Sequence, residues 1–274
     1  MMIKKIGLLF SLSGTISIVG EGQLQAALLA IQENNQNSSI QFQPIIRDDR
    51  SDPKTAAKEA YSLFRQENID ALIGCYMSSV RNAVISVLNE THGLLLYPTV
   101  YEGGQVHPSV FYLGAIPNQQ VEPLLCWTFH HISSNFILVG SDYIYPRSTN
   151  KQVRHWIENA GGKVLSESYF PLGCINFDKF FIDLKRFIKT NRSIVIFSTL
   201  VGDSVHSFYN QHYRHRLPFT IVSPITSERE ISKMDKAAAY GHICASPYFR
   251  SINSENNQRF VQTFEQKFGC TGSA

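Results

Sequence analysis

The sequence contains no apolar run that approaches the roughly 20 residues of a membrane-spanning helix, so we expect no membrane insertion. It also lacks a block of basic residues, and its net charge of +3 is too small to indicate direct nucleic-acid binding. Only 17% of the residues are charged and 43% are apolar, which excludes a disordered chain. What remains is a globular protein whose 274 residues suit one large or two small lobes.

Cysteine is scarce and scattered, with no CxxC pair, which argues against both a disulfide framework and a zinc site. The five cysteines are Cys75, Cys126, Cys174, Cys244 and Cys270. The apolar run from Ile6 to Phe10 is too short for the core of a signal peptide, and no small-residue cleavage site follows it. We therefore expect reduced thiols and a cytoplasmic location, with a periplasmic location as the alternative.

Short apolar segments alternate with longer helical patterns along almost the whole chain. This alternation predicts an α/β protein with two Rossmann-like lobes, each a mainly parallel sheet with helices on both faces. The predicted strands are 4–12, 40–47, 70–74, 93–97, 110–113, 136–140, 164–170, 193–199, 219–223 and 242–246. The predicted helices are 23–34, 55–67, 79–92, 117–131, 150–160, 177–190, 203–213, 228–234 and 256–268. Asp52 is the expected N-cap of the second helix, with Pro53 at its first position.

Tyrosines and hydroxyl side chains follow three of the predicted strands at their carboxyl ends. In open α/β sheets a ligand binds outside these ends, and the helix that follows offers free N–H groups there. A phenol supplies a flat apolar wall together with a hydroxyl that can donate or accept. The pattern therefore predicts a site for one small, polar, uncharged ligand. The residues in this pattern are Tyr76, Ser78, Tyr97, Thr99, Tyr143 and Tyr145.

Cys75 lies beside the first of these motifs and could be read as the nucleophile of an amide-cleaving enzyme. A small buried residue at the end of a strand is the favoured interpretation, because no His or Glu/Lys pair stands at a matching strand end. Asp142 and Arg147 flank the third motif, where helix capping and a surface or hinge ion pair are favoured over acid–base chemistry.

Three further patterns invite a cofactor or metal interpretation and fail on spacing. The nine histidines have no carboxylate at metal-ligand spacing. The segment from Gly20 to Gly22 lacks the remaining glycines of a dinucleotide loop, and we expect a loop that precedes a helix. The segment from Asp48 to Asp52 lacks the spacing and closing glutamate of a calcium loop, so a solvated turn is expected. We predict no cofactor, no metal and no catalytic residue.

Taken together, several ordered segments resemble a known family. They cover nearly the whole chain, and they are specific as a set although weak singly. The chain is similar to type I periplasmic-binding-protein-like proteins, in the branch of urea or short-chain-amide binding proteins and amide-binding negative regulators of aliphatic amidase operons. The matching segments are 6–11, Gly74-Cys75-Tyr76-Met77-Ser78, Tyr97-Pro98-Thr99, Tyr101-Glu102-Gly103, Pro117-Asn118-Gln119, 140–147, Phe197-Ser198-Thr199, Val201-Gly202, Thr226-Ser227-Glu228 and Ser246-Pro247-Tyr248-Phe249.

The resemblance implies two hinged lobes, 1–120 with 251–274 returning to it and 121–250, which close over a small aliphatic amide such as acetamide, or over urea. The implied ligand contacts are Tyr76, Ser78, Tyr97, Thr99, Tyr143, Tyr145, Val201, Gly202 and Thr226. The implied function is a sensor that is not an enzyme and that regulates amidase expression through a response-regulator-like antiterminator. The alternative is a solute-binding component that hands urea or amides to an ABC permease, and a homo-oligomer is compatible with both.

The resemblance also implies a fold that is incomplete at its C-terminus, because the family continues well beyond the helix at 256–268. We expect an incomplete fold to leave an exposed sheet edge and apolar surface, both of which favour aggregation. A degenerate fragment without activity is therefore a further alternative.

Overall fold

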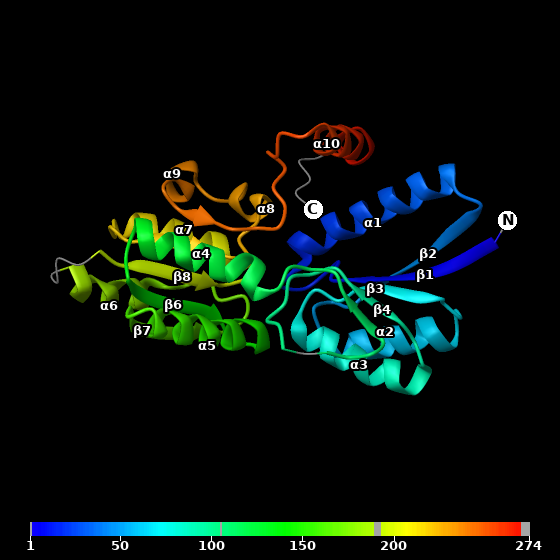
Figure 1. Ribbon diagram of the computed structural model, residues 1–274, viewed down its shortest axis with the longest axis horizontal. Helices are drawn as coiled ribbons and strands as arrows, with labels where there is room; N and C mark the ends of the chain where they lie inside the picture. Colours follow the sequence, from blue (N-terminus) through cyan, green and yellow to red (C-terminus); the bar gives the residue numbers. More distant parts are fainter. Residues whose placement is uncertain (1, 105, 189–192, 270–274) are drawn as a thin grey trace. The chain divides into compact units, whose positions relative to one another are not determined.

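The computed structural model describes residues 2–104, 106–188 and 193–269, and its ribbon is shown in Figure 1. The chain divides into two compact units, Met1–Ala115 with Tyr248–Ala274 and Ile116–Pro247. In the described part of the chain each unit contains one five-stranded sheet whose strands are all parallel. The predicted fold class, α/β with two lobes that each contain a parallel sheet, is confirmed.

The first unit has strand order β2-β1-β3-β4-β5, with α1 packed on β1 and β2, and with α2 packed against α3. Figure 1 shows α1 along one face of this sheet and α2 with α3 along the other. Its strands are β1 (Met2–Phe10), β2 (Ile40–Asp48), β3 (Ala71–Gly74), β4 (Leu95–Tyr97) and β5 (Val110–Tyr112). Its helices are α1 (Ser17–Asn37), α2 (Pro53–Arg65), α3 (Ser78–Thr91) and α10 (Glu255–Phe268).

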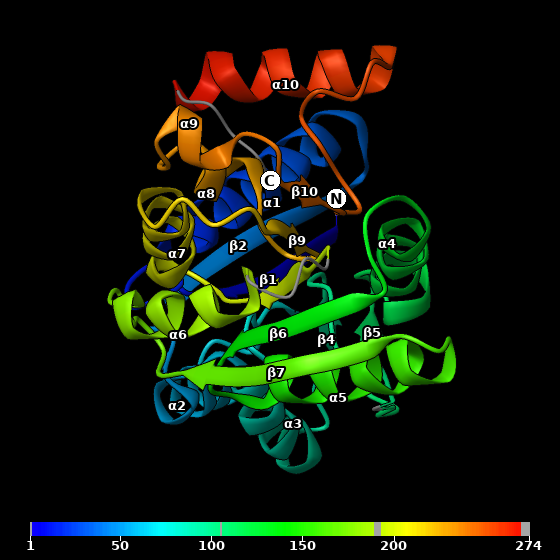
Figure 2. The ribbon, with the colours of Figure 1, turned by 90° about the vertical axis from the view of Figure 1, so that its left-hand side faces the viewer.

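The second unit has strand order β10-β9-β8-β6-β7. Figure 2 shows its strands β6 and β7 with α6 and α7 on one side and α4 on the other. Its strands are β6 (Asn135–Ser141), β7 (Lys163–Phe170), β8 (Val195–Thr199), β9 (Thr220–Ser223) and β10 (Ile243–Cys244). Its helices are α4 (Pro117–His131), α5 (Ile144–Asn159), α6 (Asp178–Ile188), α7 (Asp203–Arg214), α8 (Glu228–Ile231) and α9 (Lys236–Ala239).

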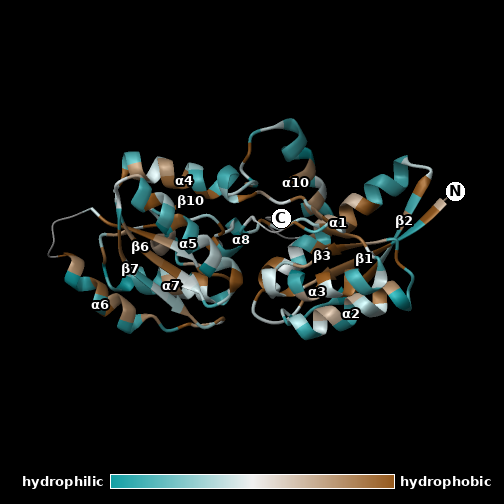
Figure 3. Ribbon diagram, turned by 60° about the horizontal axis from the view of Figure 1, so that its bottom comes forward, coloured by the Kyte–Doolittle hydropathy of each residue, from teal (hydrophilic) through white to brown (hydrophobic). Residues whose placement is uncertain are grey.

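Strand β6 shows why its sheet is covered on both faces. Ile137 and Val139 pack with α6 and α7 in one apolar cluster, whereas Phe136 and Leu138 pack with α4 and α5 in another. Successive side chains of a strand point to opposite faces, so a continuous apolar run needs two covering layers. Figure 3 shows central strands such as β6 coloured mainly as hydrophobic and the helices as mixed, in agreement with helices that bury only one side.

The start of α2 follows the sequence prediction. The Asp52 carboxylate accepts the backbone N–H of Thr55 at 2.7 Å, and Pro53 occupies the first helical position. A proline there costs no hydrogen bond, because the first N–H groups of a helix have no partner within the helix. This cap is confirmed.

Two helix starts were predicted wrongly. Helix α1 begins at Ser17, so Gly20 and Gly22 lie inside it and not in a loop. A Cβ on Gly20 would lie 2.0 Å from the carbonyl oxygen of Ser11, so glycine serves close packing of this helix on the end of β1. Helix α5 begins at Ile144 and not at 150, because Pro146 falls in the first turn, where it breaks no helical hydrogen bond.

Smaller differences occur in the second unit. Helix α9 had no predicted counterpart, and β10 covers two of the five residues predicted for it. The predicted end of the sixth helix at Thr190 lies outside the described residues. A search of the described helices for one long and apolar enough to cross a membrane found none.

Candidate functional site

Both sheets have the same doubly wound topology. In the first sheet β2 lies on one side of β1, and β3, β4 and β5 lie on the other. In the second sheet β7 lies on one side of β6, and β8, β9 and β10 lie on the other. The strand order therefore reverses between β1 and β3 and between β6 and β8. Ligands of open α/β sheets bind outside the carboxyl ends of the strands at such a reversal. The residues that follow β3, β6 and β8 include predicted site residues, and these positions therefore define one candidate edge in each unit.

In the first unit the chain leaves β3 through a tight turn at Gly74 and Cys75, which have φ values of 142° and 67°. A Cβ on Gly74 would lie 1.9 Å from the carbonyl oxygen of Leu9, so only glycine fits between β1 and this turn. The turn leads through Tyr76 to α3, whose N-cap residue Met77 makes no side-chain capping bond. The first-turn N–H groups of α3, which have no partner within the helix, therefore lie at the carboxyl edge.

Tyr97 and Ser78 lie close to Tyr76 but are already engaged within the protein. The Tyr97 hydroxyl donates to the carbonyl oxygen of Tyr76 at 2.9 Å, and its side chain is fully buried. The Ser78 hydroxyl donates to Oε2 of Glu102 at 2.7 Å. Among these three residues only Tyr76 is half-buried rather than buried. The structure brings them together, and it gives Tyr97 and Ser78 supporting contacts.

A buried ion pair that the sequence analysis missed lies beneath these residues. Nη2 of Arg81 is 2.8 Å from Oε1 of Glu102, and the arginine side chain is fully buried. Its guanidinium carbon lies 5.2 to 5.9 Å from the ring centres of Tyr97, Tyr101 and Tyr112, within reach of cation–π attraction. One signal was available, because Arg81 lies on the apolar side of a predicted helix.

Thr99 differs from the other predicted residues of the first unit. It is 7% exposed, and its Oγ1 is buried without a hydrogen-bond partner in the part of the chain that the structure describes. A buried hydroxyl normally finds a partner, so such an atom calls for an explanation. A ligand or a bound water at this edge would supply the missing bond.

In the second unit the ends of β6 and β8 are joined directly. The backbone N–H of Val201 donates to Oγ of Ser141 at 3.2 Å, across the reversal of the sheet. Tyr143 is the N-cap residue of α5 and is half-buried, whereas Tyr145 lies in the first turn of α5 and is 6% exposed. Tyr145 thus follows β6 as expected, but it belongs to the helix, because α5 starts before the predicted position.

Gly202 and Thr226 are held by a second group of buried polar residues. The Glu230 carboxylate accepts the backbone N–H of Gly202 and both the N–H and the hydroxyl of Ser227. Burial nevertheless raises the pKa of Glu230 to about 7, because desolvation outweighs these bonds. The Thr226 hydroxyl donates to Oγ of Ser223 at 2.9 Å. Glu230 was not predicted, although Ser227 and Glu230 have the S-x-x-E spacing of a capping box, which is a signal that the sequence offered.

The predicted ion pair at the third motif is confirmed. Nε of Arg147 lies 2.6 Å from Oδ1 of Asp142, and both side chains are about half exposed. The guanidinium carbon of Arg147 also lies 4.3 Å from the ring centre of Tyr169. The Arg147 guanidinium holds the pKa of Asp142 below its usual value, as expected of a surface pair.

Cys75 has the environment of a structural cysteine. It is fully buried, and burial together with the nearby Asp49 raises the pKa of its thiol well above the usual value, with Arg81 opposing. A protonated thiol is a poor nucleophile. No group of three or more His, Cys, Asp or Glu side chains suited to a metal occurs among residues 2–104, 106–188 and 193–269.

Two doubly wound sheets, each with hydroxyl groups and a tyrosine at its reversal point, define a class of α/β binding protein. Residues 4–273 match the model of the periplasmic binding protein domain family. The chain belongs to this family.

Solved structures of similar fold include three binding proteins. A solute-binding protein of an ABC transporter from Rhodopseudomonas palustris BisB5, in complex with 3,4-dihydroxybenzoic acid, has a TM-score of 0.87 and 17% identity, over 98% of this chain and 75% of that chain. The branched-chain amino acid transporter substrate-binding protein of Streptococcus pneumoniae, in complex with isoleucine, has a TM-score of 0.83 and 18% identity, over 98% of this chain and 78% of that chain. A leucine-binding protein from Thermotoga maritima has a TM-score of 0.84 and 16% identity, over 98% of this chain and 77% of that chain. At these identities the likeness establishes the fold.

Proposed function

We propose that this protein is the solute-binding component of an ABC transporter and that it binds a small uncharged amide, of the acetamide or urea type. The observation that carries the choice of ligand is the pairing of charges at the two carboxyl edges. Arg81 is neutralised by Glu102 in the first unit, and Arg147 by Asp142 in the second. At these two pairs a ligand carboxylate or ammonium group would meet side-chain charges that already have partners.

The remaining polar groups suit an amide. Its carbonyl oxygen needs donors, which the free N–H groups of α3 supply, and its NH2 group needs acceptors such as the Thr99 hydroxyl. In each unit one half-buried tyrosine, Tyr76 in the first and Tyr143 in the second, offers a flat wall of the kind that suits a short alkyl group. A site that pairs these groups discriminates against ligands that leave them unpaired.

Titration calorimetry on the full chain with acetamide, butyramide, urea, isoleucine and benzoate tests the proposal. We expect heat from one or more of the three uncharged ligands and none from isoleucine or benzoate. Binding of isoleucine or benzoate without any amide or urea would reject the proposed ligand class. Circular dichroism with a melting curve establishes first that the chain folds cooperatively, which separates a failed fold from a wrong ligand.

Two substitutions locate the contacts. Tyr76→Ala in the first unit and Tyr143→Ala in the second should each weaken binding without loss of the folded state, because neither side chain is fully buried. Tyr61→Ala is the matched control, since Tyr61 is 45% exposed on α2, away from the carboxyl edge. Unchanged affinity in both Tyr76→Ala and Tyr143→Ala would show that the site is misplaced.

The partner and location follow from the same proposal. Structures of similar fold are named as transporter components, which supports a permease partner and a periplasmic location in place of the predicted cytoplasmic one. The second candidate is the cytoplasmic amide sensor with an antiterminator partner, favoured by the ordered sequence segments that include Tyr97-Pro98-Thr99. Co-purification from the native cell separates them, because a permease and an antiterminator are unrelated proteins.

The non-enzymatic role and the oligomeric state belong to the same proposal. A family of binding proteins, together with a buried protonated thiol at Cys75, supports a protein that is not an enzyme. Release of ammonia from acetamide by the purified chain would overturn that part. A homo-oligomer stays a prediction, which light scattering of the purified chain would test.

A further inference from the structure

A pocket of about 440 Å³ lies in the second unit, at the opposite edge of the sheet from the proposed amide contacts. It is lined by residues that precede β9 and β10, among them Phe219, Gly241 and His242, whereas Ser223 and Thr226 lie at the carboxyl end of β9. The four-residue β9 separates the two edges by about 10 Å, at about 3.3 Å per residue. The volume falls in the range of small-molecule sites, about 300–1,000 Å³.

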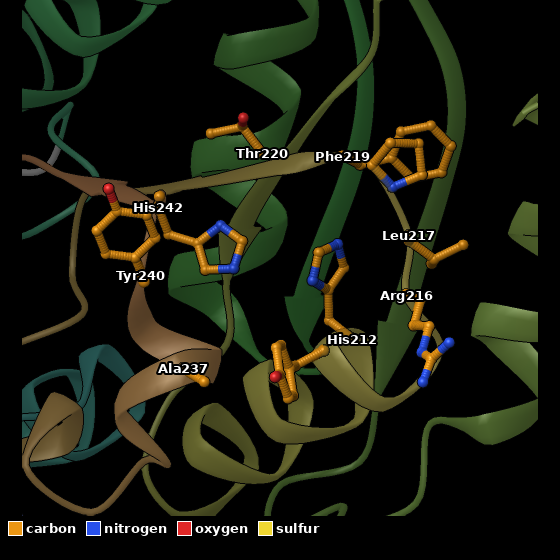
Figure 4. Close-up of a pocket in the computed structure, with 11 residues that line it drawn as sticks. His212, Arg216, Leu217, Phe219, Thr220, Ala237, Tyr240 and His242 are labelled. Atoms are coloured by element: carbon orange, nitrogen blue, oxygen red, sulfur yellow. The ribbon is translucent and has the colours of Figure 1, made fainter.

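Two imidazole rings form the polar part of this pocket. Figure 4 shows the rings of His212 and His242 turned toward each other, with the ring of Tyr240 beside His242. The two imidazole centres are 5.1 Å apart, with planes 73° from each other. His212 is 4% exposed, and its Nε2 has no hydrogen-bond partner in the described chain. A buried polar atom of this kind in a pocket wall points to a ligand.

The hydrogen bonds assign a proton to one nitrogen of each ring. Nδ1 of His242 faces the backbone N–H of Ile221 at 3.0 Å and therefore accepts, so a neutral ring carries its proton on Nε2. His212 forms a hydrogen bond with the Phe219 backbone that favours its protonated form, as a bond donated to a carbonyl does. Since Nε2 of His212 makes no hydrogen bond, its Nδ1–H is the donor and Nε2 is an acceptor.

Both rings remain neutral at pH 7. Burial, together with the nearby His242 ring, lowers the pKa of His212 to about 3, and burial lowers the pKa of His242 to about 4. A shared metal ion does not fit, because coordination through Nε2 of His242 would put a proton on Nδ1, facing the Ile221 N–H donor. The pair thus presents one donor and one acceptor, between aromatic walls.

We propose that this pocket is a second ligand site, for a small planar molecule that carries an N–H group next to a carbonyl oxygen in the same plane. The carbonyl accepts from Nε2–H of His242, and the N–H donates to Nε2 of His212. Tyr240, 88% exposed at the rim, and Phe219 supply apolar contact for the ring of the ligand. Cyclic amides and lactam-like heterocycles have this arrangement.

The test uses NMR of the histidine Cε1–Hε1 groups in the full chain at pH 7, with 2-pyridone as the probe. N-methyl-2-pyridone is the matched control, because methylation removes the N–H group and keeps the ring and the carbonyl. We expect the His212 and His242 signals, assigned with His212→Gln and His242→Gln, to shift together on addition of 2-pyridone. The methylated probe should bind about tenfold more weakly, as the loss of one buried hydrogen bond implies.

Variants that keep the fold show where 2-pyridone binds. Tyr240→Ser should weaken 2-pyridone binding several-fold, because the ligand ring loses its apolar contact at the rim. The variant should still fold, since the Tyr240 side chain is well exposed. Tyr61→Ser, in the other unit, should leave the affinity unchanged. Absence of shifts, equal affinity for both pyridones, or an unaffected Tyr240→Ser variant would each overturn the proposal, and none of these outcomes bears on amide binding at the other edge.

Discussion

Nη2 of Arg81 lies 2.8 Å from Oε1 of Glu102, and neither side chain has more than 9% of its surface exposed. The Ser78 hydroxyl binds the second carboxylate oxygen at 2.7 Å, so both oxygens of Glu102 are engaged. Three tyrosine rings surround the guanidinium. This pair joins α3 to the segment after β4, and it gives the first carboxyl edge a neutral, rigid base beneath Tyr76.

Removal of one member of this pair should be severe. We expect Glu102→Ala to lower the free energy of unfolding by about 3–5 kcal/mol, because the Arg81 charge would stay buried without its counterion. Replacement of both, as Arg81→Met with Glu102→Leu, should recover most of that loss, since an apolar pair carries no desolvation cost. Urea titration followed by circular dichroism measures both variants. Equal loss in the single and the double variant would show that packing, and not charge, is what matters there.

Ser78 and Thr99 should respond oppositely to removal of their hydroxyls. Ser78→Ala should destabilise the protein by about 1–3 kcal/mol, because buried Glu102 loses a donor. Thr99→Val keeps the shape and removes a buried hydroxyl without a described partner, so it should leave the protein as stable or more stable.

Ligand affinity separates the two residues further. Thr99→Val should weaken amide binding, because the proposed acceptor is lost while the fold is kept. A destabilised Thr99→Val variant with full affinity would contradict the assignment of Thr99 to the ligand. Thermal melts with and without the best-binding amide measure stability and affinity in the same samples.

Glu230 should make the protein less stable as the pH rises. Its pKa is about 7 in the folded state against 4.5 ordinarily, so between these values the unfolded chain releases a proton that the folded chain retains. The contribution is fully present below pH 4.5 and is lost as the pH rises toward 7, at up to about 1.4 kcal/mol per pH unit. Glu230→Gln should abolish this component. Glu122→Gln, on the exposed side of α4, is the control, and an identical pH profile for all three proteins would contradict the prediction.

His212 should make the protein less stable as the pH falls. Its pKa is about 3 in the folded state against 6.5 ordinarily, so below pH 6.5 the unfolded chain binds a proton that the folded chain does not bind. Stability should fall as the pH drops from 6.5, by up to about 1.4 kcal/mol per pH unit. Urea midpoints measured from pH 4 to 7 should vary less in His212→Gln than in the parent. His155→Gln, at an exposed position, should retain the parental profile.

Local patterns were sufficient to predict most of the architecture. Apolar runs such as Phe136–Val139 identify buried strands because both faces of a parallel strand need cover. Asp52 followed by Pro53 identified a helix start because capping depends on residues within one turn. The starts of α1 and α5 escaped prediction because Gly20 and Pro146 usually interrupt helices, and only their surroundings show that here they do not.

The sequence by itself determined the α/β class, the position of β3 with its glycine turn, and the set of tyrosines and hydroxyls that follow the strands. Only the tertiary structure decided which of these groups already have hydrogen-bond partners within the protein. Glu102 binds Ser78, 24 residues earlier in the sequence, and Glu230 binds Gly202, 28 residues earlier. It also placed His212 beside His242. The reason is physical: strand and helix patterns arise from neighbours in the chain, whereas a charge pair or a pocket depends on the winding order that brings distant segments together.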